Sequence, residues 1–176
     1  MKAFGFVGDS GSGKTTLIEK LILHFAREGL RVAAIKHAHE GFDVDRPGKD
    51  SYRFREAGAR QVLLASPRRW ALLSEEDENR TIDAPGDLLR RLLNRLEDCD
   101  VVFVEGFRGT ADIPYIEVKR NREDAAGGSR PIAAGVVAVA TDDPALAEAP
   151  HLVVLDLDDP DAIARFIATK LELPQC

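Results

Sequence analysis

Cysteine and long hydrophobic runs are scarce in this sequence of 176 residues. It contains only two cysteines, Cys99 and Cys176, which cannot form a disulfide framework or a four-ligand zinc site. The longest apolar runs, such as Val101–Val104 and Ala133–Ala140, are far shorter than the roughly 20 residues that span a bilayer. No basic and then apolar leader precedes the first strand-like segment. We therefore expect a cytoplasmic protein without a membrane-spanning segment.

Charge is unevenly distributed along an otherwise ordinary globular composition. Hydrophobic residues make up 44% of the chain and charged residues 31%, and the length predicts one domain over residues 1–176. The first 70 residues carry 13 Lys and Arg against 8 Asp and Glu, whereas the remainder carries 11 against 22. A basic N-terminal part suits an anionic ligand, and the acidic remainder argues against a nucleic-acid partner.

Apolar strand-like runs alternate with helical patterns, which predicts an α/β fold with a mostly parallel sheet flanked by helices. Strands are predicted at Lys2–Val7, Arg31–His37, Val101–Val104, Ala134–Ala140 and Leu152–Leu155, and an edge strand at the alternating segment Tyr115–Lys119. Helices are predicted where Leu17, Leu21, Ile22 and Phe25 recur at helical spacing up to Gly29, over Asp50–Ala59, from Pro85 to Leu96 and from Pro160 to Leu171. Two short apolar runs around Ser66-Pro67 predict a small β-hairpin extension over residues 61–74. The polar, Gly-rich segment Arg122–Arg130 is predicted to be a mobile loop.

A phosphate-binding loop follows the first predicted strand. Residues 8–15 read G-D-S-G-S-G-K-T and match the pattern G-x-x-x-x-G-K-[ST], in the required position between a strand and a helix. Glycine lets backbone N–H groups wrap around phosphate oxygens, and the start of the helix adds partial positive charge. We expect Lys14 to bridge the β- and γ-phosphates, Thr15 to ligate Mg²⁺ and Thr16 to reach the α-phosphate. The predicted nucleotide-binding residues are Gly8, Asp9, Ser10, Gly11, Ser12, Gly13, Lys14, Thr15 and Thr16. The sequence therefore indicates a P-loop NTPase domain.

Carboxylates at two strand ends are candidates for the rest of the nucleotide site. Glu105 follows the run Val101–Val104, so it stands where open α/β sheets bind ligands, and we predict that it holds Mg²⁺ through water and orients water as the catalytic residue. Asp142 and Asp143 follow a later strand, and either could accept hydrogen bonds from a guanine base. Asp143 lies before Pro144 and could equally cap a helix.

Many polar groups follow the second predicted strand, between Lys36 and Ser51. Three interpretations are open. The first is a transition-metal site formed by His37, His39, Asp43 and Asp45. In the second, the carboxylates, Asp45 among them, serve the Mg²⁺ of the nucleotide while Lys36 and Lys49 attract a polyanionic ligand. The third is a plain polar loop.

Five segments occur in an order that resembles the molybdopterin-guanine dinucleotide biosynthesis adapter family, MobB. They are G-D-S-G-S-G-K-T-T-L-I-E-K-L, I-K-H-A-H-E-G-F-D-V-D-R-P-G-K-D-S-Y-R-F-R-E-A-G-A, L-L-A-S-P-R-R-W-A-L, V-E-G-F-R and Y-I-E-V-K-R, and they cover about two-thirds of the chain. The resemblance implies a homodimer that binds GTP with Mg²⁺ and is at most a weak GTPase. It also implies that the protein assists a partner, a molybdenum cofactor guanylyltransferase, in converting molybdopterin cofactor to its guanine dinucleotide form. Molybdopterin is then a possible ligand, with Arg68 and Arg69 as candidates to contact its phosphate.

A P-loop small-molecule kinase is the alternative function. Such enzymes usually have a lid rich in arginines, and the lid-like stretch Arg120–Arg130 contains three arginines but also Glu123, Asp124 and two glycines. A nickel-delivery GTPase would need a Cys-containing metal motif near the second strand, and neither cysteine lies there.

Overall fold

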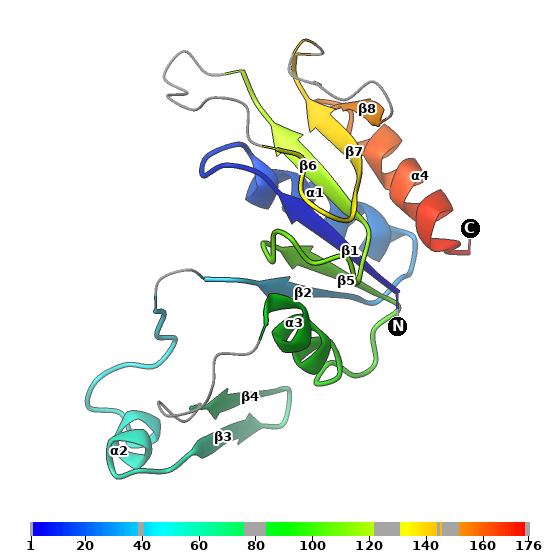
Figure 1. Cartoon of the computed structure of the whole chain (residues 1–176). Helices are drawn as coiled ribbons and strands as arrows, with labels where there is room; N and C mark the ends of the chain where they lie inside the picture. Colours follow the sequence, from blue (N-terminus) through cyan, green and yellow to red (C-terminus); the bar gives the residue numbers. More distant parts are fainter. Residues whose placement is uncertain are drawn as a thin grey trace. The chain divides into compact units, whose positions relative to one another are not determined.

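Six parallel strands form the main sheet of the computed structural model (Figure 1), which describes residues 2–38, 41–75, 84–121, 131–143, 145 and 152–174. The strands are β1 (Lys2–Val7), β2 (Val32–Lys36), β5 (Val101–Glu105), β6 (Tyr115–Lys119), β7 (Val136–Thr141) and β8 (Val153–Asp156). Their order across the sheet is β2-β5-β1-β6-β7-β8, and every neighbouring pair is parallel. The predicted α/β fold with a mostly parallel sheet is confirmed.

Two compact units divide the chain. Unit 1 consists of residues 1–37 and 83–176 and contains the six-stranded sheet, and unit 2 consists of residues 38–82. The predicted mobile loop Arg122–Arg130 lies outside the described residues. That the chain is one domain over residues 1–176 stays a prediction.

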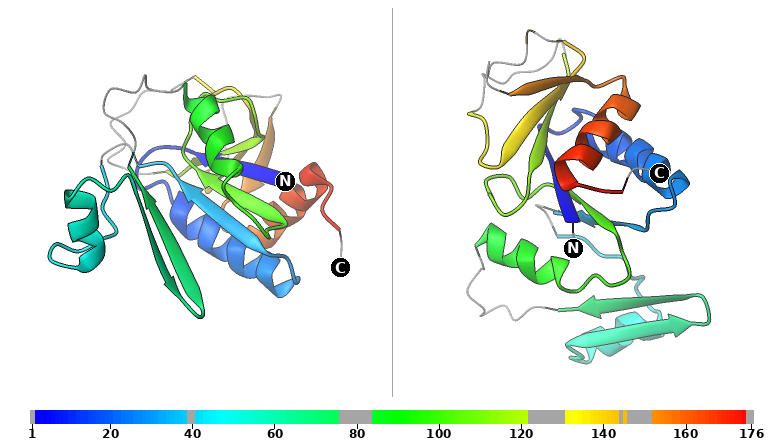
Figure 2. Two further views of the ribbon diagram at one scale, coloured as in Figure 1. Left: turned by 90° about the horizontal axis from the view of Figure 1, so that it is seen from below. Right: turned by 90° about the vertical axis from the view of Figure 1, so that its right-hand side faces the viewer.

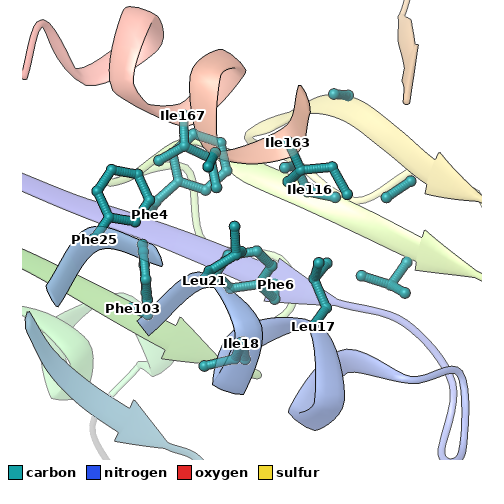
Figure 3. Close-up of a cluster of buried hydrophobic side chains, with 14 of the residues drawn as sticks. Phe4, Phe6, Leu17, Ile18, Leu21, Phe25, Phe103, Ile116, Ile163 and Ile167 are labelled. Atoms are coloured by element: carbon teal, nitrogen blue, oxygen red, sulfur yellow. The ribbon is translucent and has the colours of Figure 1, made fainter. Parts of the chain in front are cut away.

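Helices cover both faces of the sheet of unit 1. Helix α1 (Lys14–Arg27) places Leu17, Leu21 and Phe25 on one stripe because these residues recur every four positions, and this stripe packs on one face together with α4 (Pro160–Leu171). Helix α3 (Pro85–Leu93) packs on the other face (Figure 2). Figure 3 shows how side chains of α1 and α4 surround Phe4 and Phe6 of β1. This packing fixes where α1 begins relative to the carboxyl end of β1, to which it is joined by the loop of residues 8–13.

Strand β6 lies inside the sheet, between β1 and β7, so the expectation of an edge strand was wrong. The polar residue that produces the alternation, Glu117, is 97% buried, since only 3% of it is exposed. Its carboxylate oxygen Oε1 accepts a hydrogen bond of 2.9 Å from Arg108, which neutralises the charge inside the protein. Tyr115 at the start of β6 is also buried, because Gly5 of β1 leaves room for its ring: a Cβ at Gly5 would lie 2.1 Å from that ring.

Unit 2 contains helix α2 (Asp50–Glu56) and the strands β3 (Gln61–Ser66) and β4 (Arg69–Ser74). The two strands pair antiparallel, with Gln61 opposite Ser74, so the predicted hairpin over residues 61–74 is confirmed. The loop before α2 is tied to the helix because both carboxylate oxygens of Asp43 accept hydrogen bonds from the guanidinium of Arg55, at 3.1 and 2.9 Å. This bidentate pair holds the pKa of the Asp43 carboxyl below its ordinary value.

None of the described helices is both long and apolar enough to cross a bilayer.

Candidate nucleotide-binding site

The loop of residues 8–13 joins the carboxyl end of β1 to the start of α1. Gly8, Gly11 and Gly13 all have positive φ angles, of 148°, 75° and 95°, which side-chain-bearing residues rarely adopt. A Cβ at Gly8 would lie 2.3 Å from the carbonyl oxygen of Val118 in β6, so this position also has no space for a side chain. The sequence of the loop therefore folds as the phosphate-binding motif requires.

The start of α1 and the hydroxyl of Ser12 are candidates to bind a ligand. Within the described part of the chain, no side chain caps the first turn of α1, whereas Asp159 caps α4 by accepting a hydrogen bond from the backbone N–H of Ala162. The hydroxyl of Ser12 is buried and has no hydrogen-bond partner among the described residues. A helix start without a side-chain cap and a buried hydroxyl without a partner among the described residues fit a bound phosphate chain.

Lys14 lies folded over the loop from the first turn of α1. Its ammonium donates hydrogen bonds to the carbonyl oxygens of Gly8, at 2.9 Å, and of Asp9, at 2.7 Å. Burial lowers the pKa of this ammonium and the charge of Lys36 adds to the effect, whereas the carboxylates of Glu105 and Asp9 oppose it. The lysine is thus held at the mouth of the loop, and its hydrogen bonds within the described residues go to neutral carbonyls that an anionic ligand can replace.

Thr15 and Glu105 lie close together at the carboxyl ends of the strands, where the sequence predicts a magnesium site. The Thr15 hydroxyl donates a hydrogen bond of 2.9 Å to Oε2 of Glu105, although the two residues come from α1 and β5. On its other side, Oε1 of Glu105 lies 3.4 Å from the ammonium of Lys36, at the end of β2. A hydroxyl and a carboxylate are hard oxygen ligands of the kind that Mg²⁺ prefers, so the residues present fit this ion. That they bind it stays a prediction.

The carboxyl ends of β6, β7 and β8 carry a second polar cluster beside the loop. Asp142 accepts a hydrogen bond of 2.8 Å from the backbone N–H of Asn121 and lies 3.5 Å from the guanidinium of Arg120. The same guanidinium lies 3.6 Å from Asp158 and within 3.7 Å of the position that a Cβ of Gly13 would take. The cluster therefore adjoins the phosphate loop at the start of α1.

Asp142 and Asp143 have different surroundings, although the sequence did not distinguish them. One carboxylate oxygen of Asp143 accepts a hydrogen bond of 3.0 Å from the backbone N–H of Ala145, and the other accepts one of 3.1 Å from the side chain of Asn121. Residue 144 and residues 146–151 lie outside the described residues, so both the capping role of Asp143 and base recognition by Asp142 stay predictions. Arg120 was not singled out for this role in the sequence, where it ends the motif Y-I-E-V-K-R.

The residues after β2 fall in both units. His37 belongs to unit 1, where its ring stacks on Phe107 at 4.5 Å, and Asp43 and Asp45 belong to unit 2. The carboxylate of Asp45 accepts hydrogen bonds of 2.9 Å from the hydroxyl of Ser51 and the backbone N–H of Arg46. No group of three or more His, Cys, Asp and Glu side chains suited to a metal ion occurs among the described residues, and His39 lies outside them. A role of Asp45 at Mg²⁺ stays a prediction.

Comparison with known proteins finds similarity over almost the whole chain. Residues 3–142 match the family model described as molybdopterin guanine dinucleotide synthesis protein B. The molybdopterin-guanine dinucleotide biosynthesis adapter protein of Escherichia coli (strain K12) is 39% identical over 173 residues, which cover 95% of this chain and 91% of that protein. The adapter protein of Haemophilus influenzae is 38% identical over 167 residues, which cover 95% and 88%.

Solved structures show the same fold. The crystal structure of molybdopterin-guanine biosynthesis protein B superposes with a TM-score of 0.68 and 28% identity and covers 96% of this chain and 99% of that one. A MobB protein homolog from Bacillus stearothermophilus superposes with a TM-score of 0.68 and 25% identity, covering 99% of this chain and all of that one. The similarity in fold therefore includes the hairpin segment. It also includes the last third of the chain, which contains none of the five sequence segments that resemble the family.

Proposed function

The chain belongs to the family of molybdopterin guanine dinucleotide synthesis protein B, and from this we propose that it is an adapter in molybdopterin guanine dinucleotide biosynthesis that binds GTP with Mg²⁺. Its partner in this proposal is a molybdenum cofactor guanylyltransferase, which carries out the nucleotidyl transfer itself. The adapter holds the nucleotide, and molybdopterin is a possible second ligand.

The observation that supports nucleotide binding is that the helix start, Lys14 and the Thr15–Glu105 pair lie together at the start of α1. Among the described residues no side chain caps the helix start and Lys14 bonds only to carbonyl oxygens, while the Thr15 hydroxyl lies 2.9 Å from the carboxylate of Glu105. The N–H groups of the loop bind phosphate oxygens, and the ammonium of Lys14 exchanges the carbonyls of Gly8 and Asp9 for the phosphate chain. Thr15 and Glu105 hold Mg²⁺, which neutralises charge on the phosphates.

Selection of guanine is assigned to the cluster around Asp142. A carboxylate accepts two hydrogen bonds from the N1–H and 2-amino groups of guanine, whereas adenine offers no such pair of donors. The guanidinium of Arg120 is held between Asp142 and Asp158, and its planar group can stack on a base.

Hydrolysis by the isolated chain is expected to be slow, which suits an adapter. The sequence contains only two glutamines, Gln61 in β3 of unit 2 and Gln175, so neither the phosphate loop nor the strand ends described in unit 1 carry a glutamine to position water. The two described arginines near the sheet edge, Arg108 and Arg120, are already paired with Glu117 and Asp142.

Isothermal titration calorimetry of the full chain with GTP and ATP, with and without Mg²⁺, tests the proposal. We expect GTP to bind in preference to ATP and Lys14→Ala to abolish GTP binding, because the variant loses the cation that faces the phosphate chain. Lys20→Ala is the matched control, since Lys20 is an exposed lysine of the same helix.

Unchanged GTP affinity of the Lys14→Ala variant would refute the site. The same titration in the presence of the guanylyltransferase tests the adapter role: enhanced complex formation with GTP supports it, and indifference of the two proteins to each other contradicts it.

A further inference from the structure

Lys36 is the charged residue of the site for which the phosphate-loop motif supplies no role. It ends β2, directly opposite Glu105 in the parallel pairing of β2 with β5. Its side chain is 65% exposed, whereas that of Glu105 is only 16% exposed, and the two charged groups lie 3.4 Å apart. The ammonium therefore covers the carboxylate from the solvent side while keeping most of its own surface free.

The two oxygens of Glu105 are used by different partners. Oε2 accepts the hydrogen bond from the Thr15 hydroxyl, and Oε1 faces the ammonium of Lys36. Lys36 and Lys14 also lie close enough for the charge of one to destabilise the charge of the other. Two ammonium groups thus lie near the carboxylate of Glu105 at the edge of the phosphate loop, where Asp9 supplies a second carboxylate near Lys14.

A divalent cation held by Thr15 and Glu105 competes directly with Lys36, because both cations use the same carboxylate. The displaced ammonium then needs another anionic partner. A nucleoside triphosphate brings one in its terminal phosphate, whereas a diphosphate does not. We propose that Lys36 is a second phosphate-binding lysine, which covers Glu105 in the nucleotide-free protein and moves to the terminal phosphate when a nucleoside triphosphate binds with Mg²⁺.

This inference rests on the proposed function, since it needs a nucleotide in the phosphate loop. It adds a way to distinguish a nucleoside triphosphate from a diphosphate, which the phosphate loop by itself does not provide. Lys14 and the backbone N–H groups bind di- and triphosphates alike, but Lys36 contacts the terminal phosphate, which only the triphosphate has. The protein therefore recognises whether its nucleotide still has the terminal phosphate, through a residue at the end of β2.

The test compares Lys36→Met, which keeps the length of the side chain and removes its charge, with Lys36→Arg and with Lys20→Met as the matched control. Affinities for GTP and for GDP are measured by calorimetry at several Mg²⁺ concentrations. We expect Lys36→Met to lower GTP affinity by about ten- to a hundredfold, the loss of one charge-assisted hydrogen bond. At saturating Mg²⁺ the GDP affinity should be unchanged, and the Mg²⁺ concentration needed for half-maximal GDP binding should fall. Lys36→Arg should retain the preference for GTP.

An equal loss of GTP and GDP affinity in Lys36→Met would overturn the inference, because the lysine would then act only through general charge. Wild-type affinity for both nucleotides would overturn it too, while leaving the proposed function intact. Failure of the unaltered protein to bind GTP would remove both proposals together. Lys36 is exposed, and a circular dichroism melting curve confirms that each variant is folded.

Discussion

Asp142 is the residue on which the proposed selection of guanine depends. Its carboxylate is held by the backbone N–H of Asn121 and by the guanidinium of Arg120, so its position is fixed before any ligand arrives. A positioned acceptor discriminates well, because a ligand with the wrong donors leaves a polar group of the site unpaired. Base preference should therefore respond to a single change of this side chain from acceptor to donor.

We predict that Asp142→Asn weakens GTP binding by about ten- to a hundredfold, since the amide replaces one acceptor by a donor that opposes the N–H groups of guanine. Xanthosine triphosphate, which has an oxygen in place of the 2-amino group, should bind this variant better than it binds the unaltered protein. Competition titrations with the two nucleotides measure the effect. Asp158→Asn is the control, because it removes the same charge and the other carboxylate near Arg120. Equal loss for both nucleotides would exclude a contact with the base.

Single residues also show how far the sequence predicts the site. The phosphate loop has a fixed spacing, so Lys14 and Thr15 could be assigned from the sequence, and Glu105 followed from its place at the end of a buried strand. The structure brings Thr15 and Glu105 to hydrogen-bond distance, as expected. Arg120 could not be recognised, because its partners Asp142 and Asp158 lie more than 20 residues away and are brought together only by the order of the strands.

At the scale of elements, the hydrophobic pattern predicted the strands and helices well but misplaced β6. Its alternation indicated a strand with one face in water, whereas Glu117 is buried against Arg108. Nothing within the five residues of β6 distinguishes a solvated carboxylate from one neutralised by an arginine of a preceding loop. An ion pair between distant segments can therefore make an interior strand resemble an edge strand.

The Arg108–Glu117 pair should accordingly matter more for stability than an exposed pair. We predict that Arg108→Ala lowers the free energy of unfolding by about 2–3 kcal/mol, because it leaves a buried carboxylate without its charged donor. Urea denaturation measures this change. The double variant Arg108→Ala with Glu117→Gln should recover part of the loss, since a neutral amide costs less to bury than an unpaired charge.

Arg90 provides the matched control, because its ion pairs with Asp87 and Asp112 are exposed. Arg90→Ala should cost much less stability than Arg108→Ala, because water screens its ion pairs. If both arginine variants lost the same stability, the pair with Glu117 would have no special role in holding β6 inside the sheet.

At the scale of the whole molecule, the sequence predicted the hairpin. It did not predict that the hairpin belongs to a compact unit of its own, unit 2, whereas the main sheet belongs to unit 1. The pairing of β3 with β4 places Leu63, Leu72 and Trp70 on one face of the hairpin, since Leu63 is opposite Leu72 and Trp70 is two residues away. These side chains are exposed, with Leu63 at 63% and Trp70 at 67%. A two-stranded sheet is only marginally stable by itself, and a cluster of exposed apolar side chains marks an interaction surface.

We expect this face to pair with its counterpart on a second copy of the chain and so form the homodimer that the family resemblance implies. Leu63→Asp should then convert dimers to monomers at micromolar concentrations, because it would place a charge in an apolar contact; sedimentation equilibrium measures the change. Val154→Asp is the control, since Val154 is an exposed aliphatic residue of β8 in unit 1. GTP affinity should persist in both variants, because the phosphate loop, Glu105 and Asp142 all belong to unit 1. A monomeric unaltered protein, or a dimer indifferent to Leu63→Asp, would exclude this face as the dimer contact and leave it available to the partner enzyme.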